Sequence, residues 1–239
     1  DAITIKPSQS GFLQTPGTKN LTIVSSGYAD AVESLEMKHG AATKFVITTQ
    51  PTAPASNGGV LGTQPAVSLQ DQYSNTCTSD GTSSVGVVAS GASWVLGGTT
   101  PQTASSGVVT FSGLTGSSAV AVTGAAITFS LDGFSLISDP FDIPVNAHPT
   151  LTVPTDATVD SDFDIIFTDD ATWRTGISEI QYGTDVLPVG AYDKTSADAI
   201  TIKPSQSGFL QTPGTKNLTI VSSGYADAVE SLEMKHGAA

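Results

Sequence analysis

The sequence predicts an all-β protein made of tandem Ig-like β-sandwich beads in a repeat array or filament. Short runs of Val, Ile, Leu and Phe are cut by Gly, Pro, Asn and Asp roughly every eight to twelve residues, a spacing typical of sandwich strands. Only 13% of the 239 residues are charged, and 38% are hydrophobic, enough to fill conventional cores. Residues 1–42 also recur without a substitution as residues 198–239.

The recurrence of residues 1–42 indicates how the chain is divided into units. The offset between the copies is 197 residues, which is also the length of residues 43–239, so the sequence equals one full period preceded by the last 42 residues of another. We predict three units: residues 1–42 as the C-terminal half of a bead, 43–146 as an Ig-like sandwich (the first bead) and 147–239 as a complete β bead (the second bead). We expect the sequence to come from a longer tandem array.

Strand patterns fill the first bead. Alternating or continuous apolar runs bounded by polar turns predict six strands. They fall within residues 43–51, 64–75, 83–90, 107–114, 118–124 and 125–134.

The second bead is predicted to hold strands and one helical turn. The turn lies in "ATWRTGISEI" from Ala171, with Asp169 or Asp170 placed to cap it. The strands fall within residues 148–154, 162–170, 178–183, 198–203, 217–224 and 228–235. The half-bead at 1–42 would then lack partners for strands at Ile3–Lys6 and Leu21–Ser25, which a preceding repeat or a neighbouring chain could supply.

The second bead carries a family-like pattern. It reads "FTDDATWRTGISEIQYG" from Phe167, "AITIKPSQSGF" from Ala199 and "GTKNLTIVSSGYADA" from Gly214. These segments resemble the haemoglobin-interacting domain of Shr-type haem receptors, and the half copy at 1–42 shares the latter two. The resemblance implies a β bead of bacterial surface proteins, used as a spacer, an adhesive module or a receptor for haemoglobin.

The first bead resembles bacterial Ig-like repeats. The residues that carry this resemblance are Phe45, Gln50-Pro51, Gln70-Asp71, Tyr73, Asn75 and "GVVTFSGL" from Gly107. Cys77, the one cysteine, stands where such repeats usually have an apolar residue, which implies a role in core packing.

Charge and composition exclude several classes of function. A formal charge of −13 argues against nucleic acid as a partner, because phosphate backbones need a basic surface. No apolar run is long enough for a membrane span. No nucleophile–base pair is apparent among the few histidines, so we expect no enzyme.

An acidic cluster is the one candidate cofactor site. Carboxylates at alternating positions of a strand share a face, and oxygen-rich clusters suit Ca²⁺. The alternative is a solvated acidic face with turn caps. The candidate ligands are Asp160, Asp162, Asp164, Asp169 and Asp170.

The leading functional prediction is a structural one. Perfect copying suits an extracellular bacterial fibre, stalk or giant adhesin at the cell surface, whose identical units are joined head to tail. The alternative is a surface binding module for haemoglobin, haem or glycans, with Trp94 and Trp173 either buried anchors or exposed platforms. Assembly would concentrate at the short linkers, where the junction residues are Met37, His39, Lys44, Asn146, His148, Met234 and His236.

Overall fold

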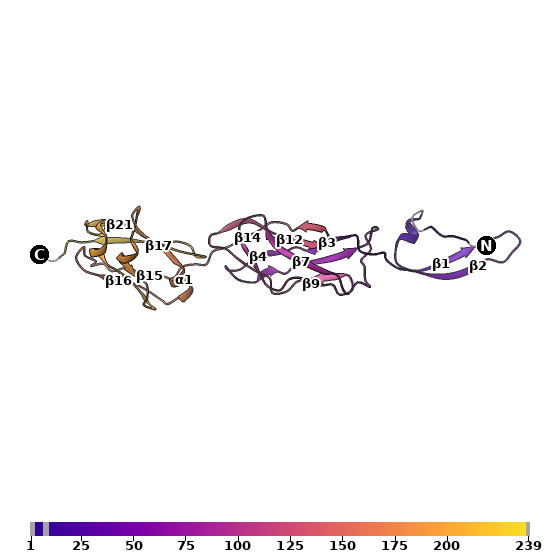
Figure 1. Ribbon diagram of the computed structural model, residues 1–239, viewed down its shortest axis with the longest axis horizontal. Helices are drawn as coiled ribbons and strands as arrows, with labels where there is room; N and C mark the ends of the chain where they lie inside the picture. The colour runs from indigo at the N-terminus through magenta and orange to yellow at the C-terminus, as the bar shows by residue number, and fades with distance from the viewer. Residues whose placement is uncertain (1–2, 7–9, 238–239) are drawn as a thin grey trace.

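The computed structural model describes residues 3–6 and 10–237, and it is all-β apart from one short helix and several 3-10 turns. Three units follow one another along the long axis (Figure 1). A β-hairpin at the N-terminal end comes first, then the first bead, then the second bead at the C-terminal end. No helix in the described ranges has the length and apolarity to cross a membrane.

The first bead is a sandwich of antiparallel sheets. One sheet has the order β10-β6-β3 and the other β13-β12-β7-β9, with β14 also pairing β12 and two small pairs, β4-β5 and β8-β11. Its strands are β3 (Lys44–Thr49), β4 (Thr52–Pro54), β5 (Leu61–Thr63), β6 (Ala66–Gln70), β7 (Ser84–Ser90), β8 (Val95–Gly97), β9 (Gln102–Thr103), β10 (Val108–Thr110), β11 (Thr115–Ser117), β12 (Val122–Leu131), β13 (Phe134–Ile137) and β14 (Phe141–Ile143). Inward-facing residues such as Val67, Phe111 and Ile127, all at most 1% exposed, form one continuous core.

One boundary prediction in this bead is wrong. The sequence suggested separate strands at 118–124 and 125–134, but β12 runs through from Val122 to Leu131. Gly124 has φ +76 and lies where the pairing of β12 shifts register, so this glycine makes a bulge and not a turn.

The second bead packs two four-stranded antiparallel sheets, with orders β15-β16-β20-β19 and β18-β17-β21-β22. Its elements are β15 (Leu151–Thr152), β16 (Phe163–Phe167), α1 (Ala171–Gly176), β17 (Ile177–Tyr182), β18 (Asp185–Val186), η3 (Val189–Ala191), β19 (Tyr192–Asp193), β20 (Ala199–Ile202), η4 (Pro204–Gln206), η5 (Gly208–Leu210), β21 (Gly214–Ser222) and β22 (Ala228–Met234). Asp170 caps α1, because its side chain accepts hydrogen bonds from the backbone N–H groups of Thr172 and Trp173. The cap fixes Trp173 in the core, where it is fully buried.

The hairpin unit consists of η2 (Gly11–Gln14), β1 (Gly17–Ile23) and β2 (Ala31–Met37). The predicted strand at Ile3–Lys6 does not form, although its copy at 200–202 is part of β20. β20 is held by β16 on one side and β19 on the other, and the described part of the chain provides no such neighbours for Ile3–Lys6. A strand sequence without partners stays irregular.

Candidate functional site

The joint between the hairpin unit and the first bead is formed around His39. The Nε2 atom of His39 accepts a hydrogen bond from the backbone N–H of Ser79 at 3.0 Å and lies 2.9 Å from its hydroxyl. The Nδ1 atom is 2.7 Å from the carbonyl of Gly40, so it must carry the proton. Lys44, at the start of β3, donates to the hydroxyl of Ser74. His39 and Lys44 were both predicted as junction residues, and both line this joint.

Asp71 fastens the linker to the first bead. Its carboxylate accepts hydrogen bonds from the backbone N–H groups of Gly40, Tyr73 and Asn75 and from the side chain of Asn75. Burial raises the pKa of Asp71, but these hydrogen bonds outweigh it and hold the pKa at about 2. The same Asn75 amide donates to the carbonyl of Gln14 at 2.7 Å, which ties η2 to the first bead.

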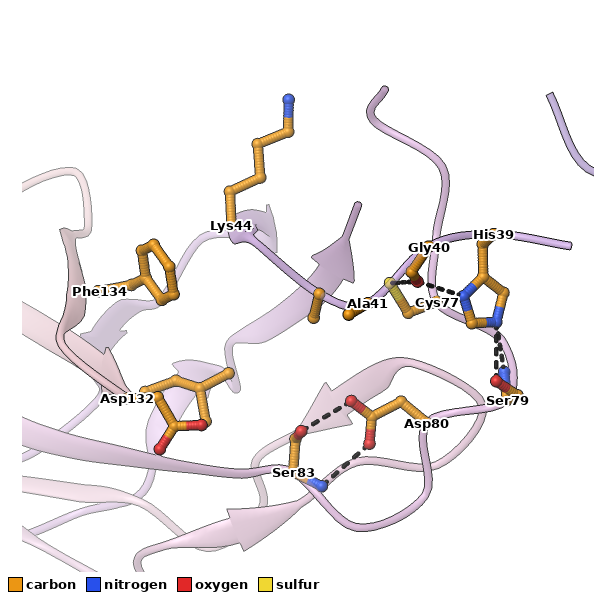
Figure 2. A pocket seen from close by; sticks show the side chains of 12 residues that line it. His39, Gly40, Ala41, Lys44, Cys77, Ser79, Asp80, Ser83, Asp132 and Phe134 are labelled. Carbon is orange, nitrogen blue, oxygen red and sulfur yellow. Dashed lines mark hydrogen bonds between the residues drawn. The ribbon is translucent and has the colours of Figure 1, made fainter. Parts of the chain in front are cut away.

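A pocket of about 530 Å³ opens beside this joint (Figure 2). Cys77 lies at its wall, 1% exposed, with its thiol 3.5 Å from the carbonyl of Gly40. Burial, followed by the negative charges of Asp71 and Asp80, raises the pKa of this thiol. Cys77 is therefore a buried packing residue beside the linker, and its thiol is not activated as a nucleophile.

Asn57, which was not predicted from the sequence, forms side-chain hydrogen bonds at the joint between the two beads. Asn57 donates through its backbone N–H to Oδ1 of Asn146, and through Nδ2 to the carbonyls of Ser118 at 2.6 Å and Gly224 at 3.0 Å. Its Oδ1 accepts from the N–H of Ser118. Gly224 has φ +80, and a Cβ there would lie 2.9 Å from the Asn57 amide, so the contact needs glycine.

Asn146, a predicted junction residue, pairs with the second bead directly. Its N–H donates to the carbonyl of Gly224, and its carbonyl accepts from Ala226, which makes a parallel bridge to Tyr225. The N–H of Gly224 donates in turn to the carbonyl of Ala119. This network of backbone and amide bonds links the two beads directly.

Asn57→Ala should weaken this joint. The substitution removes three side-chain hydrogen bonds, so we expect the free energy of unfolding of the first bead to fall by about 1–3 kcal/mol. The scattering profile of the intact chain in solution should also report a wider range of bead orientations. Asn217→Ala, at an exposed strand position, is the control. Identical scattering for both variants and the parent would contradict the assignment.

The remaining predicted junction residues lie apart from these networks. Met234 is buried in the core of the second bead, while its copy Met37 is half-buried at the end of the hairpin. His148 contacts the carbonyl of Pro149 through Nδ1, and His236 is exposed beyond β22.

The predicted acidic cluster is not assembled. β16 begins at Phe163, so Asp160 and Asp162 lie in the preceding turn and do not share a strand face with Asp164. Asp164 accepts a hydrogen bond from Thr201. Among residues 3–6 and 10–237, no three His, Cys, Asp or Glu side chains converge as metal ligands.

The two aspartates that follow β16 have other partners. Asp169 forms an ion pair with Arg174 at 3.2 Å. Asp170 caps α1 and accepts a hydrogen bond from the hydroxyl of Tyr225 at 3.0 Å. Burial and the bond to Asp170 raise the pKa of Tyr225. These contacts join α1 to the loop between β21 and β22, next to the joint.

The interior of the second bead is filled by its own side chains. Trp173 and Tyr182 are both 0% exposed, and the rings of Trp173 and Phe167 pack edge to face with centroids 5.0 Å apart. Trp94 in the first bead is also buried, at 8%. Both tryptophans are therefore core anchors and not exposed platforms.

Exposed apolar side chains of the second bead include Val189, 81% exposed on η3, and Phe209, 46% exposed on η5. The turns η3 and η5 both lie against η4. The two exposed side chains that they carry, Val189 and Phe209, are together called here the turn patch.

One comparison with known proteins finds a match within the second bead. A family model described as "Heme-binding protein Shr-like, Hb-interacting domain" matches residues 151–235. The resemblance predicted for this bead is confirmed, over a little more than a third of the chain. The search of curated proteins found no match.

Solved structures show only distant likeness. One is a tri-modular GH5 endo-β-1,4-glucanase from Bacillus licheniformis complexed with cellotetraose, with 11% identity, a TM-score of 0.30 and coverage of 80% of this chain and 38% of that one. Another is the SGBP-B protein of a Bacteroides ovatus mixed-linkage glucan utilization locus with a bound heptasaccharide, with 12% identity, a TM-score of 0.27 and coverage of 93% and 54%. The chain thus spans about two fifths and about half of these proteins, and TM-scores this low carry no argument about function.

Proposed function

We propose that this chain is a segment of a bacterial cell-surface protein whose second bead binds haemoglobin through its outer surface. The first bead would serve as the structural support of the second. The observation that carries the proposal is the family match over residues 151–235. The hydrogen-bonded joint between the beads supports the role of the first bead as a carrier of the second.

Binding at the surface, without haem capture, follows from the interior of the second bead. Its core is closed by Trp173 and Tyr182, so no internal space remains for a porphyrin. Its buried methionine, Met234, is 1% exposed and cannot reach an external haem iron. The core of this bead therefore offers neither a cavity nor an axial ligand for haem, and the partner that we propose is the folded haemoglobin protein.

The turn patch is the contact surface that we propose. Interfaces gain most of their affinity from a few large apolar anchors that are desolvated on binding. Phe209 is a large aromatic side chain of this kind, and Val189 adds a smaller exposed apolar group. Both stand on 3-10 turns whose backbone is held by local hydrogen bonds, for example from the N–H of Ala191 to the carbonyl of Pro188. A pre-ordered surface loses little entropy on binding.

The test is binding of purified haemoglobin to the immobilised full chain. Val189→Asp should weaken binding at least tenfold, since it places a charge in the desolvated centre of the contact. Val88→Asp, at a side chain 59% exposed on the first bead, is the matched control and should bind like the parent. Free haemin should give no Soret shift at stoichiometric ratio. Absence of haemoglobin binding, equal loss in both variants, or a Soret shift would each overturn the proposal.

A second candidate function is a structural repeat of a fibre or stalk, joined head to tail to identical units. The identical hairpin unit at the far end of the first bead favours it, because one interface could then repeat along an array. A longer protein could combine both roles, with binding beads carried along a stalk.

A further inference from the structure

The hairpin unit and its copy have the same backbone pairing. β1 pairs with β2 from Gly17↔Met37 to Ile23↔Ala31, and β21 pairs with β22 in the same register 197 residues later. The sequences are identical, so any difference in burial between the two hairpins reports the neighbours that one has and the other lacks.

The core-facing side of the hairpin unit is open. Leu218, Leu232 and Met234 are buried at 0–1%, while their copies in the first hairpin are only half-buried. The exposed fractions of three isoleucines are 70% for Ile3, 38% for Ile5 and 40% for Ile23, against 0% for the copies Ile200, Ile202 and Ile220.

The edge of β1 is open as well. In the second bead, β17 pairs along the outer edge of β21, which therefore continues to Ser222. Among the residues that the structure describes, β1 pairs only with β2, and it ends at Ile23, leaving Val24 72% exposed. Tyr182 at the end of β17 donates its hydroxyl to the carbonyl of Gly214.

The loop of the hairpin also lacks the contacts that cover its copy in the second bead. Tyr28 is 80% exposed, whereas its copy Tyr225 is half-buried and bonds to Asp170. The missing cover must therefore supply a strand for the β1 edge, a strand for Ile3–Lys6, a tryptophan for the core and a carboxylate for Tyr28.

We infer that the hairpin unit is an acceptor for a segment equivalent to residues 151–197, supplied by another repeat of the same protein. That segment carries all four features, as β17, β16, Trp173 and Asp170. It already covers the identical sequence once in this chain, so its fit to the hairpin is demonstrated by the second bead itself.

The occupant must be an additional copy. Within this chain residues 151–197 are engaged by 198–234, and moving them to the hairpin would exchange one set of contacts for an identical one. The first bead also separates the hairpin unit from the second bead, which lie at opposite ends (Figure 1). The hairpin unit would therefore bind residues 151–197 of another repeat and not those of its own chain.

The test extends the chain at Asp1 with a copy of residues 147–197, so that Ala197 precedes Asp1 as it precedes Asp198. Trp94 and Trp173 are replaced by Phe, which leaves the added copy of Trp173 as the only reporter. We expect its emission to be blue-shifted and to change in one cooperative unfolding transition, because the added tryptophan enters a closed core.

Two matched substitutions decide between a completed bead and a loose tail. Ile23→Asp should abolish the blue shift and the transition, since the copy Ile220 is fully buried. Val32→Asp should leave both unchanged, since the copy Val229 stays 50% exposed even in the complete bead. In the chain without the extension and with Trp94 retained, both positions are exposed, so neither substitution should alter the unfolding of the first bead followed through Trp94. Solvent-exposed emission from the added tryptophan, or equal effects of the two substitutions, would overturn the inference.

Discussion

Trp173→Ala should lower the free energy of unfolding of the second bead by about 3–5 kcal/mol, the usual effect of deleting a fully buried aromatic side chain. Trp173 is 0% exposed and packs edge to face on Phe167. Its carbonyl accepts a buried hydrogen bond from Ser222 at 2.7 Å, so movement of α1 into the cavity would also disturb β21. Because domain stabilities are typically about 5–15 kcal/mol, the loss would bring this bead close to unfolding.

Denaturant unfolding can follow the two beads separately, since each contains one tryptophan. In Trp173→Ala the remaining Trp94 reports the first bead, whose midpoint should stay as in the parent, while circular dichroism reports the earlier loss of the second bead. Phe209→Ala, at a half-exposed aromatic of the same bead, is the control and should change its stability far less. A shift of both beads together, or of neither, would contradict the packing argument.

Asp71→Ala should destabilise the first bead by about 2–4 kcal/mol. The substitution leaves the N–H groups of Gly40, Tyr73 and Asn75 without their acceptor in a site where Asp71 is only 2% exposed. Because Gly40 belongs to the linker, the hairpin unit should also be held less firmly. Urea unfolding of the intact chain measures the effect, with exposed Asp139→Ala as the control.

The pH dependence of the parent gives a second measurement of Asp71. Its folded pKa of about 2 lies below the value of about 3.9 expected in the unfolded chain. Its contribution to stability is therefore fully present above about pH 5 and is lost as the pH falls through about 2, by about 2.6 kcal/mol in all. Asp71→Ala should show a shallower loss of first-bead stability over this range, and an unchanged acid slope would contradict the assigned hydrogen bonds.

Local features of the fold could be predicted from the sequence. The identical register of the two hairpins, one in a closed core and one without, shows that strand pairing there is determined by nearby residues. The cap at Asp170 was predictable for the same reason, since it depends only on Thr172 and Trp173. The family pattern around Trp173 is also local.

Features that depend on distant contacts could not be predicted. Asn57 is separated from Asn146 by 89 residues and from Gly224 by 167, and nothing in "PASNGG" marks it as a joint residue. The expected grouping of five aspartates failed because the strand starts later than the alternation suggested. Carboxylates next to a strand are equally suited to caps and ion pairs, and Asp169 and Asp170 serve in those roles.

The hydrogen bonds of Asn57 also affect the shape that an array of repeats would have. Each period contains this joint and the joint at Asp71, so copies of the period would be related by one combined rotation, and a repeated rotation gives a superhelix. Where several of these periods follow one another, changes at Asn57 or Gly224 would alter the pitch of that superhelix through one of its two joints.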